Sequence, residues 1–358
     1  MLNSLYEKAI TKRGFIHDID SQTDVESQLE YKWFNRDILE SNDDFSIAAG
    51  DGSFNKKKFL TTNFCAVGAE SIIYNDANIK KIDDSDIFDI PHVSFLDELL
   101  GNYMAIYELK CALRTIKDYD VDYYMFDGSI LGDLQNAFPR GAKLPSKLKN
   151  NLDDVLLKEF EERLRIKKYG LVFPEIRDSL NLVELPKNEN SNKIEEYNLQ
   201  LASIEKIILL KELLQFRKRI ISISKSSSDN ELFHWNIPDI AFLDKFTEKQ
   251  GISLIKYRQV HEKVAFPYFN DLFKSITFTV FYIRLQDKKN VLKVELPYKA
   301  SKEEVFDLIK KINKLTVQGY PYLLNRAHND VVITDKNIKE LLKIARIYET
   351  TNREVMSW

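Results

Sequence analysis

Two short stretches of the chain end in the same three residues, Asp-Gly-Ser. The first is SIAAGDGSF, residues 46–54, and the second is YYMFDGSI, residues 123–130. In each, an apolar run ends on an aspartate, Asp51 or Asp127. Asp-Gly is a strong turn signal, so two tight turns are the simpler explanation. The alternative is that two adjacent strands present two carboxylates to one site.

The residues around Asp51 predict a meander of strands. Residues 45–54 form an apolar run that is typical of a strand, and residues 58–74 predict one or two further strands. Short turns between them indicate an antiparallel arrangement of three strands.

A helix separates this meander from the strand of Asp127. It is predicted over residues 92–120, with Ser94 and Asp97 as a capping box and acidic residues in its first turn. Because the strand of Asp127 follows a helix, we expect it to run parallel to the strand of Asp51 through a crossover connection.

Glu108 lies within this helix and is a third candidate carboxylate. Burying a carboxylate without a cation or a hydrogen-bond donor costs free energy, so a position on an apolar face needs a reason. A metal ion would supply one, and a structural ion pair with a lysine or arginine is the simpler explanation. The neighbours at helical spacing are small or apolar: Met104, Ala105, Cys111 and Ala112.

The segment GYPYLLNRAHND near the C-terminus contains a candidate histidine. Pro321 fits the first turn of a helix, which places His328 about two turns further on, beside Arg326. Tyr320 and Tyr322 add polar-tipped aromatic rings to the same segment. A lone histidine is often structural, so a functional and a structural role both stay open.

Lys225 is the last candidate. It ends the predicted strand IISIS, residues 220–224, and leads into a serine-rich stretch. A lysine at a strand end flanked by hydroxyls suits a phosphate, and a solvated loop lysine is the simpler explanation.

Composition and absent motifs limit the function classes. The net charge of −3 does not indicate a nucleic-acid binder, although basic runs at 55–59, 143–149, 163–169 and 216–220 can create a local positive field. The chain has no GxxxxGK[ST], GxSxG, HExxH or CxxC motif.

Its two cysteines lie in apolar segments and are expected to be reduced. Without a signal peptide or an apolar run of membrane-spanning length, a cytoplasmic protein with no membrane partner is expected.

Taken together and in order, five pieces of the chain resemble the NurA family of archaeal and bacterial nucleases. The pieces are IAAGDGSF, IYELKCALR, YYMFDGSI, ISISKSS and GYPYLLNRAH with the following VVIT, and they span nearly the whole sequence. The resemblance implies an α/β fold with an RNase H-like (PIWI-like) mixed-sheet core, flanking helices and a helical insertion. It also implies a ring-like homodimer that acts with a HerA-type hexameric helicase in DNA end resection.

This resemblance also assigns roles to residues. It implies a two-metal DNA nuclease that uses Mn²⁺, with Mg²⁺ as an alternative and two ions per active site. The implied activity is that of a 5′–3′ exonuclease, with single-strand endonuclease activity as a further possibility. The implied metal ligands are Asp51, Glu108, Asp127 and His328. The implied DNA contacts are Lys225, Arg326 and one of the tyrosines, Tyr320 or Tyr322.

The composition shifts divide the chain into four predicted parts. Residues 1–40 are an N-terminal helical segment, and 41–139 are the first part of the nuclease core. Residues 140–218 are a helical insertion, and 219–358 are the second part of the core with the C-terminal helices. Two other classes of protein stay open at this point. One is an actin-like or haloacid-dehalogenase-like phosphotransferase, and the other is a non-catalytic, helicase-associated DNA clamp.

Overall fold

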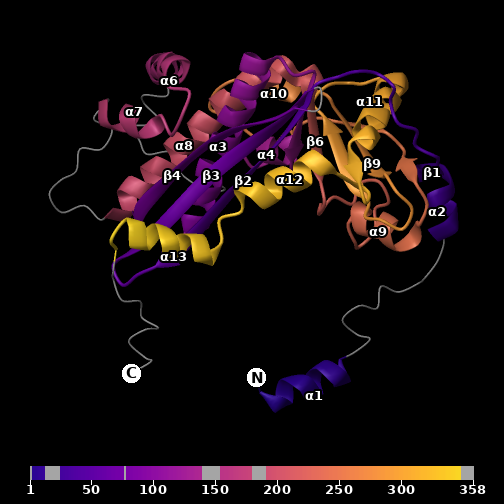
Figure 1. The fold of residues 1–358 in the computed structure, drawn as a ribbon, viewed down its shortest axis with the longest axis horizontal. Coiled ribbons are helices and arrows are strands. Elements are labelled where there is room, and N and C mark those ends of the chain that lie inside the picture. The colour runs from indigo at the N-terminus through magenta and orange to yellow at the C-terminus, as the bar shows by residue number, and fades with distance from the viewer. Residues whose placement is uncertain (1, 13–24, 76–77, 139–153, 180–190, 348–358) are drawn as a thin grey trace.

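A computed structural model of the chain describes residues 2–12, 25–75, 78–138, 154–179 and 191–347. Within these residues a sheet of ten strands runs through the molecule, and helices cover both of its faces (Figure 1). No helix in the described part of the chain is long and apolar enough to cross a bilayer.

The sheet has the strand order β1-β7-β9-β10-β6-β5-β2-β3-β4, with β8 paired to β9 beside this path. A separate two-stranded sheet joins β11 and β12. The strands are β1 (Trp33–Asn35), β2 (Ile47–Lys58), β3 (Thr62–Asn75), β4 (Asn78–Pro91), β5 (Tyr123–Asp127), β6 (Ile220–Ser224), β7 (Gly251–Ser253), β8 (Lys256–Arg258), β9 (Phe278–Arg284), β10 (Leu292–Leu296), β11 (Thr316–Val317) and β12 (Tyr320–Pro321).

The helices lie mainly between the strands in sequence and at the two ends of the chain. They are α1 (Asn3–Thr11), α2 (Val25–Lys32), α3 (Leu96–Tyr119), α4 (Ile130–Gln135), α6 (Asp154–Ile166), α7 (Phe173–Ser179), α8 (Ser191–Leu213), a 3-10 helix (Leu214–Arg219), α9 (Asp239–Phe246), α10 (Asn270–Ser275), α11 (Lys302–Lys314), α12 (Tyr322–Val331) and α13 (Asp335–Ile344).

The predicted meander is present, but its strands differ from the prediction. β2, β3 and β4 form three antiparallel neighbours, and residues 62–75 make one long strand. The third strand, β4, lies in residues 78–91, where no strand was predicted. β4 is the edge of the sheet and is largely exposed, so it lacks the apolar alternation that marks a buried strand. β2 also continues beyond its predicted end at Phe54, to Lys58.

The predicted crossover is confirmed. β5 follows α3 and pairs with β2 in parallel, with Gly50 opposite Phe126. Asp51 and Asp127, the next residue of each strand, therefore start from neighbouring backbone positions. This arrangement confirms the predicted α/β class with a mixed-sheet core and flanking helices.

The start of α3 differs from the prediction. Its N-cap is Phe95, which makes no side-chain capping bond, so the Ser94–Asp97 capping box is wrong. The Asp97 carboxylate instead pairs with the Lys56 ammonium of β2. Asp97 and Glu98 do lie in the first turn, as predicted.

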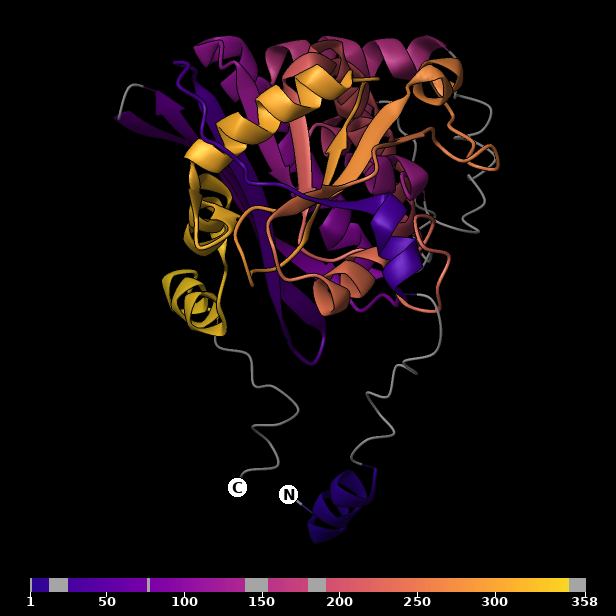
Figure 2. The ribbon, with the colours of Figure 1, turned by 90° about the vertical axis from the view of Figure 1, so that its right-hand side faces the viewer.

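The two faces of the sheet carry separate apolar cores, and this separation determines where the site residues point. On β2, Ala48 belongs to the core beneath α3 and α8, whereas Ile47 and Ala49 pack in the core with α11 and α12. Because side chains alternate along a strand, Asp51 faces α12. Figure 2 shows the yellow C-terminal helices on one side of the indigo strands and the magenta helices on the other.

Helix α8 lies in the core under the first face. Its residues Leu201, Ile204 and Ile207 are fully buried, and the Asn102 amide of α3 donates to the Ser203 hydroxyl over 3.1 Å. Residues 154–179 and 191–219 are largely helical, as predicted for the segment 140–218. Residues 140–153 and 180–190 of that segment lie outside the described residues, and the four-part division of the chain stays a prediction.

The N-terminal prediction needs one correction. Residues 3–11 and 25–32 are helical, but residues 33–35 form β1, which pairs antiparallel with β7. The Trp33 ring packs beside Gly251 of β7, so tertiary pairing rather than helical periodicity places this aromatic residue. Residues 1 and 13–24 of the predicted N-terminal segment lie outside the described residues.

Candidate metal centre

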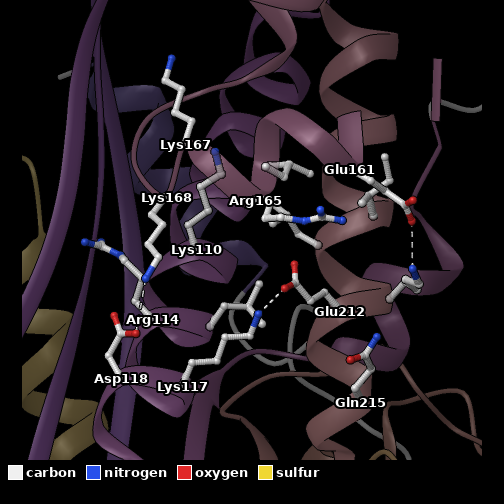
Figure 3. Close-up of a pocket in the computed structure, with 15 residues that line it drawn as sticks. Lys110, Arg114, Lys117, Asp118, Glu161, Arg165, Lys167, Lys168, Glu212 and Gln215 are labelled. Atoms are coloured by element: carbon white, nitrogen blue, oxygen red, sulfur yellow. Dashed lines mark hydrogen bonds and ion pairs between the residues drawn. The ribbon is translucent and has the colours of Figure 1, made fainter. Parts of the chain in front are cut away.

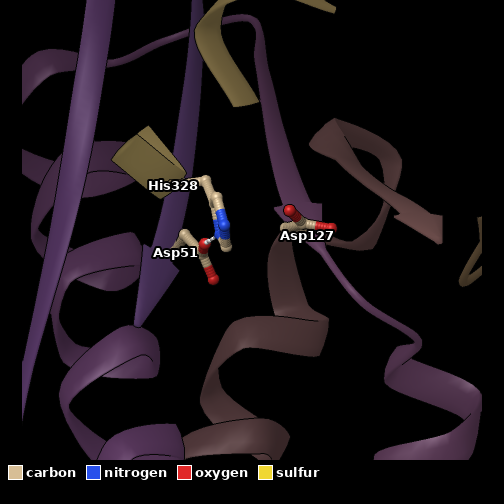
Figure 4. Close-up of side chains that lie close together, drawn as sticks. All are labelled: Asp51, Asp127 and His328. Atoms are coloured by element: carbon tan, nitrogen blue, oxygen red, sulfur yellow. Dashed lines mark hydrogen bonds and ion pairs between the residues drawn. The ribbon is translucent and has the colours of Figure 1, made fainter. Parts of the chain in front are cut away.

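Three of the four predicted metal ligands converge at one point of the sheet. Asp51 comes from β2, Asp127 from the end of β5 and His328 from α12 (Figure 4). One ligand atom of each lies within 4.8 Å of the others. Since the three elements are far apart in the sequence, tertiary structure brings these donors together.

Asp51 is the most buried member of this group, with 9% of its surface exposed. Its Oδ1 accepts the Gly52 N–H over 2.8 Å, and its Oδ2 lies 2.7 Å from His328 Nδ1. Burial raises the pKa of the Asp51 carboxyl and the nearby Asp127 charge adds to this, whereas the bond to His328 opposes it. A divalent cation would relieve the repulsion between the buried Asp51 carboxylate and the half-buried Asp127 carboxylate.

Asp127 is held by residues for which the family resemblance implied a contact with DNA. The Lys225 ammonium lies 2.8 Å from Asp127 Oδ2, and the Tyr320 hydroxyl lies 3.3 Å from the same oxygen. The Lys225 ammonium is also 4.6 Å from the centre of the Tyr320 ring. Tyr322 is different, because it is 40% exposed and its hydroxyl accepts from the Arg326 guanidinium over 3.3 Å. Of the two tyrosines, Tyr320 is therefore the one at the aspartates.

Glu108 reaches the site from the opposite face of the sheet. A Cβ atom added to Gly52 would lie only 2.6 Å from Glu108 Oε1, so the glutamate lies directly against this backbone. Burial raises the pKa of the Glu108 carboxyl well above its usual value, and the charge of Asp51 raises it further. Glu98, the other acidic candidate of α3, is exposed in the first turn. Glu108 thus lies near Asp51 but outside the group of three converging donors.

Arg326 lies in a charged network beside the site. Its guanidinium is 3.2 Å from Asp330, which is 2.7 Å from Lys81 on β4. Lys81 also lies 3.1 Å from Glu70, which is directly opposite Asp51 in the β2–β3 register. Lys81 and Glu70 are not among the site residues predicted from the sequence. The only signal for them is the strand register, which requires knowing that residues 78–91 form a strand.

A separate cavity of about 380 Å³ lies between α3, α6 and α8 (Figure 3). It contains none of the predicted site residues. Its lysines are largely matched by carboxylates: Lys211 lies 3.0 Å from Glu161, and Lys117 pairs with Glu212. Because these charges are paired, the residues that line the cavity do not form a cluster of metal-ligating groups like the one at Asp51.

The donor set fits a hard divalent ion. Carboxylate oxygens with one imidazole nitrogen suit Mn²⁺ and related ions, whereas zinc sites favour thiolates and several histidines. The fold and this donor set define an α/β protein with a mixed sheet and a candidate divalent-metal centre.

The family model that matches the chain is the NurA domain, over residues 45–333. The chain belongs to the NurA family. A curated relative from Methanocaldococcus jannaschii, the probable DNA double-strand break repair nuclease NurA, is 29% identical over 98% of this chain and 89% of its own.

Solved structures show the same fold. The NurA nuclease from Sulfolobus solfataricus superposes with a TM-score of 0.74 at 21% identity, covering 96% of each chain. A structure of NurA bound to dAMP and manganese gives a TM-score of 0.60 at 16% identity, covering 99% of this chain and 100% of its own.

Proposed function

We propose that this chain is a metal-dependent DNA nuclease. The observation that carries the proposal is the convergence of Asp51, Asp127 and His328 from three distant elements within 4.8 Å. Family membership supports it, as do the names of the relatives, which are described as DNA double-strand break repair nucleases. A phosphotransferase of the actin-like or dehalogenase-like class gains no support from these comparisons.

We assign the metal ligands to four residues, Asp51, Asp127, His328 and Glu108, which would hold Mn²⁺ or Mg²⁺ with two ions per site. Two such ions neutralise charge on the scissile phosphate and favour ionisation of the attacking water. Glu108 is assigned because its carboxylate lies against the Gly52 backbone, next to Asp51. Manganese in a solved NurA structure supports the choice of ion.

Lys225 and Tyr320 are assigned to the phosphate side of the site. Lys225 is 42% exposed and already neutralises Asp127, so a phosphate arriving beside Asp127 would lie within its reach. Tyr320 holds Asp127 through its hydroxyl, which supports a role in orienting this ligand. The exposed Tyr322 ring is then the better candidate for stacking on a base, with Arg326 beside it.

The finer points of the function rest on the family resemblance. They are 5′–3′ exonuclease polarity, single-strand endonuclease activity, a homodimer and a HerA-type helicase partner in DNA end resection. The helices α1 and α2 carry exposed apolar side chains such as Leu5, Tyr6 and Tyr31, which supports burial against a second chain.

A metal-titrated digestion tests the main proposal. Single-stranded and double-stranded oligonucleotides labelled at either end are incubated with the EDTA-treated protein and increasing Mn²⁺, Mg²⁺ or Ca²⁺. We expect cleavage with Mn²⁺, weaker cleavage with Mg²⁺ and binding alone with Ca²⁺. DNA binding without cleavage under every metal would instead favour the clamp. The position of the label that is released first reports the polarity.

A further inference from the structure

A buried charged network contacts the turn that follows Asp127. Glu295 and Lys293 occupy alternate positions of β10, are 1% and 6% exposed, and lie 2.8 Å apart. Two buried charges on a central strand cost free energy unless other groups satisfy them. The partners of Glu295 are therefore informative.

Glu295 binds the turn that follows Asp127. Its two carboxylate oxygens lie 2.7 and 2.9 Å from the Ser129 hydroxyl, and Oε2 also accepts the Leu131 N–H over 3.2 Å. The Ser129 oxygen in turn accepts the Gly132 N–H over 2.8 Å, which fixes the hydroxyl proton toward Glu295. Ser129 is two residues after Asp127, so this contact sets the path of the chain as it leaves the candidate ligand.

The same network reaches the loop of Lys225. Lys293 lies 3.4 Å from Asp229, which is also paired with Arg258. Asp229 is four residues after Lys225, the residue that contacts Asp127 from the other side. The buried pair thus connects the turn that follows Asp127 with the loop that follows Lys225, its lysine partner.

We propose that the Lys293–Glu295 pair, acting through Ser129, is a positioning element for the metal ligand Asp127. This inference rests on the proposed function, because it assigns the pair to metal binding and phosphodiester cleavage. Hydrogen-bonded groups behind a metal ligand fix its orientation, and changing them costs about 10–100-fold in metal affinity or activity. A network that only stabilises the fold would leave metal affinity unchanged.

The chain offers a matched control in Glu205. This residue is fully buried, lies 3.0 Å from Lys110, and accepts the Val172 and Phe173 N–H groups over 3.0 and 2.8 Å. It therefore resembles Glu295 in burial, lysine partner and backbone bonds. None of its described contacts involves Asp51, Asp127 or His328.

The test compares Glu295→Gln, Ser129→Ala, Ser129→Thr and Glu205→Gln with the unchanged protein. Mn²⁺ affinity is measured by electron paramagnetic resonance of free Mn²⁺, and cleavage is measured under single turnover. Thermal unfolding reports stability. We expect Glu295→Gln and Ser129→Ala to lose about 10–100-fold in Mn²⁺ affinity or in cleavage rate. Ser129→Thr, which keeps the hydroxyl, and Glu205→Gln should retain both.

Two results would overturn the inference. One is a loss of Mn²⁺ affinity and cleavage in Glu295→Gln no larger than in Glu205→Gln. The other is equal behaviour of Ser129→Ala and Ser129→Thr, which decides the question if Glu295→Gln does not fold. An unchanged protein that neither binds Mn²⁺ nor cleaves DNA would refute the proposed function as well. If the protein without substitutions is active and the Glu295→Gln and Ser129→Ala variants are equally active, the inference is refuted and the proposed function stands.

Discussion

Gly52→Ala is the sharpest probe of Glu108, because it changes neither charge nor a predicted ligand. The added Cβ would lie 2.6 Å from Glu108 Oε1, 2.7 Å from Met104 Cγ and 2.8 Å from Glu108 Cγ. Ordinary contacts between carbon atoms lie at about 3.5–4.0 Å, so the Glu108 side chain must retreat by about 1 Å. A shift of that size at a reacting centre can cost about 100-fold in rate, or about 2.7 kcal/mol.

The assay separates chemistry from binding and stability. We expect single-turnover cleavage with Mn²⁺ to fall about 100-fold, and DNA affinity in Ca²⁺ to stay nearly unchanged. Overpacking should lower the free energy of unfolding by about 1–3 kcal/mol. Gly101→Ala on α3 is the control, because nothing lies within 4 Å of its added Cβ. In a helix interior that change should stabilise the fold by about 0.5–1 kcal/mol and leave cleavage intact.

A Gly52→Ala protein with full activity and an unchanged Mn²⁺ requirement would refute this reasoning. Glu108 would then not need its position against β2, and it would no longer be a candidate ligand. Weaker DNA binding together with slower cleavage would point instead to a general distortion of β2.

Three further predictions concern the same site. Asp51→Asn and Asp127→Asn should each abolish Mn²⁺-dependent cleavage while DNA binding in Ca²⁺ persists, and near-normal cleavage by either variant would remove that residue from the ligand set. Glu108→Gln should raise the melting temperature in EDTA, because burial raises the pKa of this carboxyl in the folded state. That gain should appear as the pH rises above the usual pKa of 4.5 and grow until the folded carboxyl ionises, and a gain that is equal at every pH would contradict it. Lys225→Ala should lower the salt dependence of DNA affinity by about one unit of slope, measured with Ca²⁺ at several salt concentrations, and an unchanged slope would leave Lys225 without a phosphate contact.

The sequence predicted those parts of the fold in which local pattern and tertiary role agree. The apolar run before Asp51, the helix of Glu108 and the parallel strand of Asp127 all appear where expected. β4 could not be predicted, because an exposed edge strand has no apolar face and carries acidic residues that protect it from pairing. The short strands β1, β7 and β8 have three residues each, too few to show a period.

Some residues of the site could likewise be predicted from their local sequence, whereas others depend on the tertiary structure. His328 was predicted from its segment, but the choice between Tyr320 and Tyr322 depends on where α12 begins. The helix starts at Tyr322, whose ring is exposed. Tyr320 lies in β12, and its hydroxyl reaches the Asp127 carboxylate. Glu295 had one usable signal in the sequence. It forms an alternating charged pair with Lys293 inside an otherwise apolar strand, which is costly unless both charges are satisfied.

The repeated Asp-Gly-Ser is not one structure used twice. Gly52 lies inside a continuing strand, and its missing side chain lets Glu108 approach from the other face of the sheet. Gly128 instead leaves its strand with φ +150°, a conformation that favours glycine, and begins the turn into α4. The serines differ in the same way, since Ser53 accepts the Ile333 N–H near α13 and Ser129 caps α4. Turn propensity therefore accounts for the glycine of the second motif. The glycine of the first motif is explained by the Glu108 carboxylate, which packs against its backbone from the α3 face of the sheet.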